Sequence, residues 1–489
     1  MNTTASPLPL ADTDLLRTRC PIGGQWLDAD SGAACEVANP ATGAVLGTVP
    51  DMGAAETRRA IAAAHAAFPA WSKKTAKERA QVLRRLYQLM MEHQDDLALL
   101  MTAEQGKPLA EAKGEVAYSA SFIEWFGEEA KRMYGETIPG HAADKRIMVL
   151  RQPVGVVAAI TPWNFPSAML GRKLGPALAA GCTVVCKPAL QTPYSALALA
   201  VLAERAGIPP GVINIVTGRP EAIGAELTGN EAVRKLSFTG STRVGALLMA
   251  QCAGSVKRLS LELGGNAPLI VFDDADLEAA VEGAMVSKFR NGGQTCVCAN
   301  RILVQEGIYD AFAAALSERV GRLRVGDGLA GAVDVGPMIN SAALDKIDRH
   351  LRDALEKGAR RLTPERAVPP GRFVAPVVLG DAGTDMALAQ EETFGPVAPL
   401  FRFSSEAEAL AIANGTPFGL AAYFYTRDLA RAFRVGEALE FGMVGLNTGL
   451  ISTEVAPFGG IKQSGLGREG ARAGIEEYLE LKSFHMAGL

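Results

Sequence analysis

The chain has 489 residues, of which 48% are apolar and 21% are charged, a composition typical of globular proteins and not of disordered or fibrous ones. Its 49 Lys and Arg against 53 Asp and Glu give a net charge of −4, so no excess of positive charge indicates binding to nucleic acid or to an anionic membrane. The length is enough for two large domains and a smaller appendage.

The first strong periodic pattern runs from residue 75 to residue 104. Apolar residues recur there near helical spacing, and Gly106 and Pro108 follow the last of them. We therefore expect one long amphipathic helix over this range.

Two later segments have the pattern of extended arms. Residues 137–151, TIPGHAADKRIMVLR, are typical of two strands around a turn, and residues 477–486, EYLELKSFHM, are typical of one more strand without an obvious local partner. Because an unpaired strand edge favours pairing with another chain, we expect these segments to contact a second subunit.

A different sequence pattern begins at residue 154. Short β-rich runs alternate with helical patterns as far as residue 274, in the order VGVVAAIT, CTVVCKP, VINIVTG, RKLSFTG and APLIVFDD, and the alternation restarts after residue 300. Strands that alternate with helices predict parallel sheets, so we expect two successive α/β units.

Cysteine usage and the N-terminal segment indicate a cytoplasmic protein. Seven scattered cysteines, an odd number, are typical of reduced thiols. Asp12 and Asp14 lie where a secretory signal needs an apolar run, and the apolar stretches either have strand length or contain Arg172 and Lys173, so we expect neither export nor a membrane span. The five histidines are isolated from the cysteines and from one another, so we expect no metal site.

Three glycine-rich segments are candidates for phosphate binding. GDGLAG at 326–331 and GLGREG at 465–470 match the dinucleotide fingerprint, but neither follows a predicted strand, so we interpret both as loops. In FTGSTRVG, a strand leads through Gly240 and Ser241 into a helix that contains Gly245, which would let a phosphate approach free N–H groups. A plain glycine-rich turn is the alternative.

Polar residues in apolar surroundings are the candidates for catalysis. Asn164 in PWNFP and Glu262 in LELGG each follow a predicted strand, and ligands bind beyond strand ends in α/β sheets. Helix capping is the alternative for both. NGGQTCVCAN places Cys296 and Cys298 in a glycine-rich loop, either as reactive thiols or as small buried residues.

Taken together, these motifs resemble the aldehyde dehydrogenase superfamily in their order and approximate spacing. The resemblance runs from about Gly23 to the C-terminus and rests on PWNFP, KPALQTP, FTGST, LELGGNAP, GQTC, EETFGP and PFGGIKQSGLGREG. Longer segments, among them KFRNGGQTCVCANR and VAPFGGIKQSGLGREG, are similar to the succinate-semialdehyde dehydrogenase branch, which also contains glutarate-semialdehyde dehydrogenases.

The resemblance implies an α/β fold of the aldehyde dehydrogenase type, with two doubly wound parallel-sheet domains and a β oligomerisation arm. It assigns residues 1–136 and 153–264 to a dinucleotide-binding domain, residues 265–460 to a catalytic domain, and residues 137–152 with 461–489 to the arm. It also implies a homodimer or a homotetramer.

The resemblance further implies the oxidation of an aldehyde through a covalent thioester. Cys296 is expected to attack the carbonyl, while the Asn164 amide and the Cys296 backbone N–H stabilise the oxyanion. Hydride then passes to the nicotinamide of NAD(P). Glu262 is expected to activate the water that hydrolyses the thioester and to assist the deprotonation of Cys296.

Cofactor contacts follow from the same resemblance. Lys187 matches the lysine at the adenosine ribose, Glu392 matches the residue that holds the nicotinamide ribose, and Phe394 lies beside the ring. The other implied cofactor-binding residues are Thr161, Pro162, Trp163, Gly240, Ser241 and Gly245. Leu190 stands where many NAD-preferring relatives carry Glu, and a leucine does not repel a 2′-phosphate, so we expect NADP to be favoured and NAD accepted.

Arg172, Arg290 and Ser452 match the positions at which this branch binds the ω-carboxylate of its substrate. We therefore expect oxidation of succinate semialdehyde to succinate, with glutarate semialdehyde or a broader range of aldehydes as the alternative. A relative that passes its acyl group to coenzyme A would lack the deacylating Glu262. A non-catalytic protein on the same scaffold would be free to lose Cys296 or Asn164, yet both are present.

The resemblance suggests one regulatory role, a disulfide between Cys298 and Cys296 under oxidation. Alternating side chains in an extended loop would point both thiols the same way, but their Cα atoms would lie ~6.5 to 7 Å apart, at the edge of bridging distance. A redox switch and a packing role for Cys298 both stay open.

Overall fold

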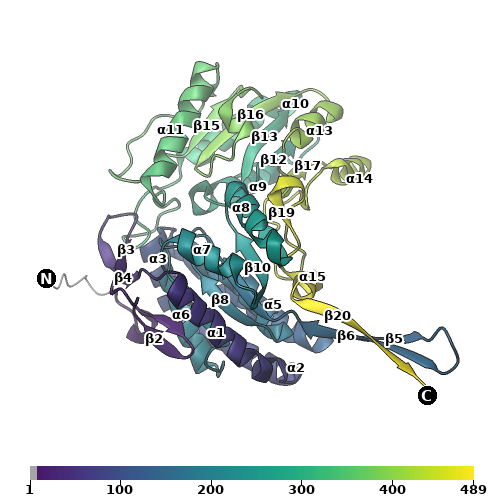
Figure 1. The fold of residues 1–489 in the computed structure, drawn as a ribbon. Coiled ribbons are helices and arrows are strands. Elements are labelled where there is room, and N and C mark those ends of the chain that lie inside the picture. Colours follow the sequence, from purple (N-terminus) through teal and green to yellow (C-terminus); the bar gives the residue numbers. More distant parts are fainter. Residues whose placement is uncertain (1–7, 489) are drawn as a thin grey trace.

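Two mainly parallel sheets and a projecting three-stranded arm make up the fold of residues 8–488, which the computed structural model describes (Figure 1). The chain begins with a short 3-10 helix and two antiparallel hairpins, followed by four helices. These elements are Thr13–Leu15, β1 Cys20–Ile22, β2 Gln25–Leu27, β3 Ala34–Ala38, β4 Val45–Pro50, α1 Ala54–Ser72, α2 Ala76–Glu92, α3 Gln94–Gln105 and α4 Leu109–Glu129.

The long helix expected over 75–104 is two helices, α2 and α3, that meet at His93. The backbone of His93 leaves the helical region at φ −103° and ψ 20°, and this residue ends α2 and begins α3. Apolar residues lie on the buried sides of both helices, so a hydrophobic pattern does not reveal the change of direction between them. The expectation of a single helix was wrong for this reason.

The first sheet has six strands in the order β19-β11-β10-β7-β8-β9, and all neighbours are parallel except the short β19. Its strands are β7 Val156–Ile160, β8 Thr183–Lys187, β9 Ile213–Ile215, β10 Val233–Thr239, β11 Arg258–Glu262 and β19 Gly465–Leu466. The helices that follow its strands are α5 Pro166–Ala180, α6 Tyr194–Arg205, α7 Pro220–Gly229 and α8 Thr242–Cys252, with a 3-10 turn at Ala253–Ser255.

The second sheet has seven strands in the order β14-β15-β16-β13-β12-β17-β18, again parallel except for its edge strand β14. Its strands are β12 Ala267–Val271, β13 Ala299–Gln305, β14 Arg360–Arg361, β15 Val377–Gly380, β16 Val397–Phe403, β17 Ala421–Tyr425 and β18 Met443–Leu446. Its helices are α9 Leu277–Phe289, α10 Glu306–Gly321, α11 Ser341–Glu356, α12 Ala387–Gln390, α13 Glu406–Asn414 and α14 Leu429–Ala438.

Both faces of the second sheet are buried. Leu269 and Val271 of β12 pack into one apolar cluster, whereas Ile270 between them packs into another on the opposite face. Successive strand residues point to opposite faces, so two separate cores require helices on both sides. The α/β fold of two doubly wound sheets is thereby confirmed.

The arm consists of β5 Glu136–Pro139, β6 Lys145–Pro153 and β20 Leu479–Ala487 and projects from the body in Figure 1. Its last strand has a partner within the chain, because β20 pairs antiparallel with β6 from Leu479 opposite Pro153 to Ala487 opposite Lys145. The pattern at 477–486 suggested no local partner, since the partner lies more than 300 residues earlier. The short helices Ala130–Arg132 and α15 Ala471–Glu476 precede the arm strands β5 and β20, and a further short helix, Lys462–Ser464, precedes β19.

The glycine-rich segments behave differently from one another. GDGLAG at 326–331 forms a loop, as expected, whereas GLGREG at 465–470 begins with β19, which pairs with β11 and so is more than a loop. FTGSTRVG forms the expected turn between β10 and α8, and the Ser241 hydroxyl caps that helix by accepting a hydrogen bond from the Val244 N–H. Among residues 8–488, no helix combines the length and apolar character that crossing a membrane requires.

Candidate active site

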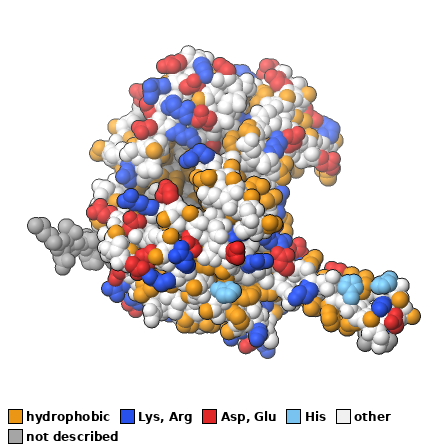
Figure 2. Space-filling model, in the orientation of Figure 1, with side chains coloured by type: hydrophobic (Ala, Val, Ile, Leu, Met, Phe, Trp, Pro, Cys, Tyr) orange, Lys and Arg blue, Asp and Glu red, His pale blue; other side chains and the backbone are white. Residues whose placement is uncertain are grey.

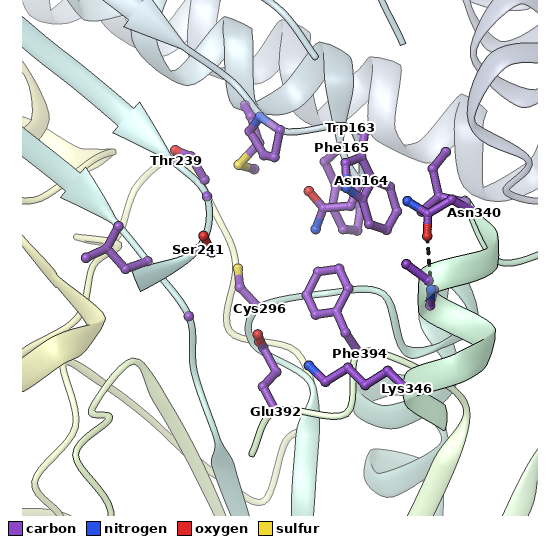
Figure 3. A pocket seen from close by; sticks show the side chains of 18 of the residues that line it. Trp163, Asn164, Phe165, Thr239, Ser241, Cys296, Asn340, Lys346, Glu392 and Phe394 are labelled. Carbon is purple, nitrogen blue, oxygen red and sulfur yellow. Dashed lines mark hydrogen bonds between the residues drawn. The ribbon is translucent and has the colours of Figure 1, made fainter. Parts of the chain in front are cut away.

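A cavity of about 340 Å³ is lined by turns and helices that adjoin the two large sheets, and many of the predicted site residues lie in it (Figure 3). Eight of those residues line it, namely Pro162, Trp163, Asn164, Gly240, Ser241, Cys296, Glu392 and Phe394. The remaining predicted residues are not part of its lining, namely Thr161, Arg172, Lys187, Gly245, Glu262, Arg290, Cys298 and Ser452. Folding thus brings Cys296, the Asn164 amide, Glu392 and Phe394 together around one space.

Asn164 lies in the turn between β7 and α5, with its side chain at the cavity wall (Figure 3). Its Nδ2 atom donates a 3.0 Å hydrogen bond to the backbone carbonyl of Gln294, so the side chain does not cap a helix. An amide nitrogen carries two N–H groups, and one of them therefore remains for an oxyanion.

A buried ion pair holds the backbone of Asn164 from behind. The Nζ atom of Lys107 donates to the Asn164 carbonyl at 2.7 Å and to the Glu115 carboxylate, and both charged side chains are buried. The other carboxylate oxygen of Glu115 accepts from the N–H groups of Ser167 and Ala168 in the first turn of α5. Lys107 and Glu115 were missed from the sequence, because a Lys and a Glu eight residues apart indicate nothing about a shared buried partner.

The loop that carries Cys296 has an unusual backbone. Asn291, Gly292 and Gly293 have φ values of 52°, 62° and 75°, and a Cβ atom on Gly293 would lie 2.3 Å from the Gly395 carbonyl oxygen. Glycine is therefore required at 293 by both conformation and space. Asn291 strengthens the loop, because its Nδ2 atom donates to the Asn164 carbonyl at 3.0 Å and so joins the two catalytic turns.

The thiol of Cys296 is held in its protonated form. Burial raises its pKa to about 12, the carboxylates of Glu392 and Glu262 add to the effect, and the charges of Arg172 and Arg290 oppose it. A thiol with this pKa is almost entirely protonated at neutral pH, so attack on a carbonyl requires a base or a change on binding.

Glu262, the expected base, is buried at the end of β11, and its Oε2 atom has no hydrogen-bond partner among the described residues. Burial and the neighbouring Glu469 raise the pKa of Glu262 well above its usual value. The side chain lies against Gly459, where a Cβ atom would come within 2.8 Å of Oε1. A carboxyl group with a raised pKa and one free oxygen is suited to proton transfer.

Glu469 is the second carboxyl group in this region. Burial alone would raise its pKa, but the charges of Lys173 and Arg172 outweigh burial and lower that pKa. Lys173 donates to Glu469 at 2.6 Å. Glu262 and Glu469 are thus two buried carboxyl groups with pKa values shifted in opposite directions, the first suited to exchange a proton and the second to stay charged.

The residues at the other end of the cavity fit a dinucleotide. Gly240 and Ser241 precede the N-terminus of α8, and helix N-termini attract anions such as phosphate. The rings of Trp163 and Phe394 meet edge to face at 5.7 Å. Burial raises the pKa of Glu392 to about 7, and the nearby Lys346 opposes this shift. Lys346 lines the cavity from α11 and was missed, since a lysine on an amphipathic helix is ordinarily interpreted as solvent-exposed.

Three other predicted cofactor residues lie beyond the cavity lining. Lys187 ends β8 and is buried, burial lowers its pKa to about 8, and its Nζ atom has a weak contact of 3.4 Å with the Pro188 carbonyl. Thr161 lies directly after β7. Gly245 has a packing role, because a Cβ atom there would lie 2.3 Å from Leu263.

The two arginines expected at the substrate lie in different surroundings. Arg172 is 1% exposed, its Nη1 atom lies 3.7 Å from the Met169 sulfur, and its Nη2 atom has no acceptor among the described residues. Its Nε atom lies 2.8 Å from Glu469 Oε2 without the alignment of a hydrogen bond. Arg290 is half-buried, with its guanidinium carbon 5.3 Å from the centre of the Phe165 ring.

Cys298 is buried, and its thiol points to the backbone carbonyl of Lys288 at 3.6 Å. Burial raises its pKa, which disfavours the reactive thiolate. All seven cysteines are free thiols in the structure, so the disulfide with Cys296 stays a prediction.

Comparison with known proteins identifies the family of the chain that forms this cavity. Residues 26–484 match the model of the aldehyde dehydrogenase family. The chain belongs to the aldehyde dehydrogenase family. This confirms the resemblance of its motifs, and the chain is an aldehyde dehydrogenase by fold and by sequence.

Among its relatives, this aldehyde dehydrogenase is 64% identical to glutarate-semialdehyde dehydrogenase of Pseudomonas putida over 97% of this chain and 99% of that protein. It is also 64% identical to succinate-semialdehyde dehydrogenase [NADP(+)] of Escherichia coli, over the same shares of the two chains. The crystal structure of succinate-semialdehyde dehydrogenase from Burkholderia pseudomallei superposes with a TM-score of 0.97 at 62% identity, covering 98% of this chain and 100% of the other.

Proposed function

We propose that this aldehyde dehydrogenase oxidises succinate semialdehyde to succinate with NAD(P), through a thioester on Cys296. The observation that carries the proposal is the buried guanidinium of Arg172, whose Nη2 donor has no acceptor within the described chain. A buried donor without an acceptor is costly, and the carboxylate at the far end of a semialdehyde would supply one.

The reaction begins with the attack of the Cys296 thiolate on the aldehyde carbon, and Glu262 takes the thiol proton. The Asn164 amide and the Cys296 backbone N–H stabilise the resulting oxyanion, and the loss of one such donor typically costs about 3 kcal/mol of transition-state stabilisation. Bound NAD(P), held by the Gly240–Ser241 turn and Glu392, would supply the acceptor for the hydride whose loss converts the thiohemiacetal to a thioester. Glu262 then removes a proton from the water that releases the acid and frees Cys296.

The position of Arg172 agrees with this assignment. The arginine touches Met169, which lines the cavity together with Cys296, so its charge lies close to the end of the cavity where the aldehyde reacts. Arg290 reaches the same region over the Phe165 ring. Together with Ser452, these residues would bind a small ω-carboxylate, and the names of the E. coli and B. pseudomallei relatives support that substrate class.

Glutarate semialdehyde is the second candidate, because the P. putida relative of the same identity is named for it. The two substrates differ by one methylene group, which is worth only about 1 to 3 kcal/mol of discrimination in a binding pocket. Both belong to the same class of ω-carboxy aldehydes.

For the cofactor we infer a preference for NADP, with NAD accepted. Leu190 provides no carboxylate that would repel a 2′-phosphate at the adenosine ribose. Lys187, in the same sequence motif, carries a positive charge that would attract this phosphate. The bracketed NADP(+) in the name of the E. coli relative supports this inference.

We infer that the first sheet binds the cofactor, that the second carries the catalytic loop, and that the arm joins copies of the chain into a homodimer or homotetramer. Figure 2 shows hydrophobic side chains over α8 and along the arm. The exposed ones include Leu247 and Met249 on α8 and Leu481 and Phe484 on β20. Apolar side chains in such number on the surface are typical of an interface. The free cysteines support a cytoplasmic location.

The test is NAD(P)H formation by the purified protein with succinate semialdehyde, glutarate semialdehyde, the C6 semialdehyde and butanal, with each cofactor and with or without coenzyme A. We expect both shorter semialdehydes to exceed butanal in kcat/KM by at least tenfold, with no requirement for coenzyme A. Equal kcat/KM for butanal and succinate semialdehyde would contradict the proposed substrate class.

A further inference from the structure

Tyr118 on α4 is a half-buried residue whose hydroxyl the proposed reaction does not use. Its ring packs edge to face on Phe122 with a centroid distance of 5.0 Å, and the Phe122 ring lies 5.6 Å from the guanidinium carbon of Arg172. Tyr118 of α4 and Arg172 of α5 therefore both contact the ring of Phe122. The hydroxyl of Tyr118 is fully buried and has no hydrogen-bond partner among the described residues.

The surroundings of this hydroxyl contain more donors than acceptors. The charges of Arg172 and Arg290 act on it, and it faces the hydroxyl of Ser452 without reaching hydrogen-bond geometry. The nearest buried carboxylate, Glu469, already accepts from Lys173 and contacts the Nε atom of Arg172. The phenol and the Nη2 atom of Arg172 are thus two buried donors that lack a shared acceptor.

The segment that carries Ser452 is held against the same helix. The hydroxyl of Ser121, one turn after Tyr118 on α4, lies 2.8 Å from the Tyr118 carbonyl and 3.3 Å from the Glu454 carboxylate, two residues after Ser452. The segment that carries Ser452 therefore meets α4 one turn from Tyr118.

The protonation state of Tyr118 leaves its hydroxyl able to donate a hydrogen bond. Burial and the charge of Glu469 raise the pKa of Tyr118 in spite of the two arginines. The hydroxyl thus remains protonated at neutral pH and is available as a donor.

We propose that Tyr118 donates a hydrogen bond to the ω-carboxylate of the substrate and, with Arg172, Arg290 and Ser452, determines the preference for carboxy aldehydes. A carboxylate offers about four lone-pair directions, enough for four donors. This assignment rests on the proposed function, because it names a further donor at the same site. Tyr118→Phe removes only the hydroxyl and keeps the ring contact with Phe122, so the effect of the hydroxyl can be measured separately.

The experiment compares Tyr118→Phe with the parent in kcat/KM for succinate semialdehyde, glutarate semialdehyde and butanal. A hydrogen bond to a charged group lost from a buried site reduces kcat/KM by about 10- to 100-fold, and we expect this loss for both semialdehydes and less than a twofold change for butanal. The matched control is Tyr425→Phe, which removes another buried unpartnered hydroxyl, on β17 beside Gly283, and which we expect to leave all three values unchanged.

A second measurement does not depend on turnover. Succinate should raise the melting temperature of the parent and of the Tyr425→Phe protein more than that of Tyr118→Phe at equal concentration. If Tyr118→Phe keeps the parent's ratio of semialdehyde to butanal and the same protection by succinate, the assignment of Tyr118 is wrong while the proposed function stands. If the parent itself does not prefer semialdehydes to butanal, the proposed function fails, and the role of Tyr118 fails with it.

Discussion

The Nζ atom of Lys107 donates a 2.7 Å hydrogen bond to the backbone carbonyl of Asn164, which lines the same cavity as the proposed nucleophile Cys296. Lys107 is only 2% exposed, and burial lowers its pKa in spite of the adjacent Glu115. A buried cation held by a carboxylate therefore positions the turn that carries Asn164, the proposed oxyanion donor.

Lys107→Met should reduce both stability and kcat. It leaves Glu115 buried without its partner, which typically costs about 3 to 5 kcal/mol in the free energy of unfolding, and it releases the Asn164 turn. The double variant Lys107→Met with Glu115→Gln should recover part of the stability but little of kcat. Denaturant unfolding and steady-state kinetics measure the two effects separately, and full recovery of kcat in the double variant would refute a positioning role.

Cys296→Ala should abolish aldehyde oxidation and leave cofactor binding nearly unchanged, because the thiol forms the bond and other residues hold the dinucleotide. Glu262→Gln should still acylate but stall in hydrolysis. Rapid mixing should show a burst of NAD(P)H from Glu262→Gln followed by a slow steady state. Substantial turnover by Cys296→Ala would contradict the assignment of the nucleophile.

Arg290→Met is the cleaner of the two arginine variants, since Arg290 forms no ion pair within residues 8–488, whereas Arg172 is paired with Glu469. Loss of a charge-assisted hydrogen bond should lower kcat/KM for succinate semialdehyde by about 10- to 150-fold. Butanal should lose far less. Arg172→Met should show the same selectivity together with a lower melting temperature, and equal losses for both substrates would count against carboxylate binding.

Cofactor binding should depend on pH through Glu392. Burial raises its pKa to about 7, so a rise in pH from 6 to 8 removes its proton and creates the carboxylate that accepts from the ribose hydroxyls. The Kd for NADP should therefore fall by up to about tenfold over this interval, because the ionised fraction rises about tenfold. Fluorescence titration of Glu392→Gln should give a flat profile, and an unchanged slope in this variant would assign the pH dependence to another group.

Leu190→Glu should shift cofactor preference towards NAD. The new carboxylate would accept from the ribose hydroxyls and repel a 2′-phosphate, and about 1.4 kcal/mol of repulsion already lowers kcat/KM for NADP tenfold. Leu190→Gln, of the same size and without charge, is the matched control and should shift the ratio less. A parent ratio that favours NAD by more than tenfold would overturn the inferred preference.

Local patterns in the sequence were enough to predict the sheet and turn elements that carry the site. The alternation of β-rich and helical runs predicted β7, β8, β9 and β10 and the helices α6 and α8, because each element follows from the residues of one short segment. The motifs likewise placed Asn164 after a strand and Cys296 in a glycine-rich loop. The family follows from these motifs alone.

Only the tertiary structure decided the relations between segments far apart in the chain. The pairing of β20 with β6, the contact of Lys107 with Asn164, the approach of Arg172 to Glu469 and the shared surroundings of Tyr118 and Arg172 each join residues from separate elements. The raised pKa values of Glu262 and Cys296 also arise only when folding removes water from these groups. Desolvation and long-range contact depend on how elements pack, and no local pattern of residues encodes them.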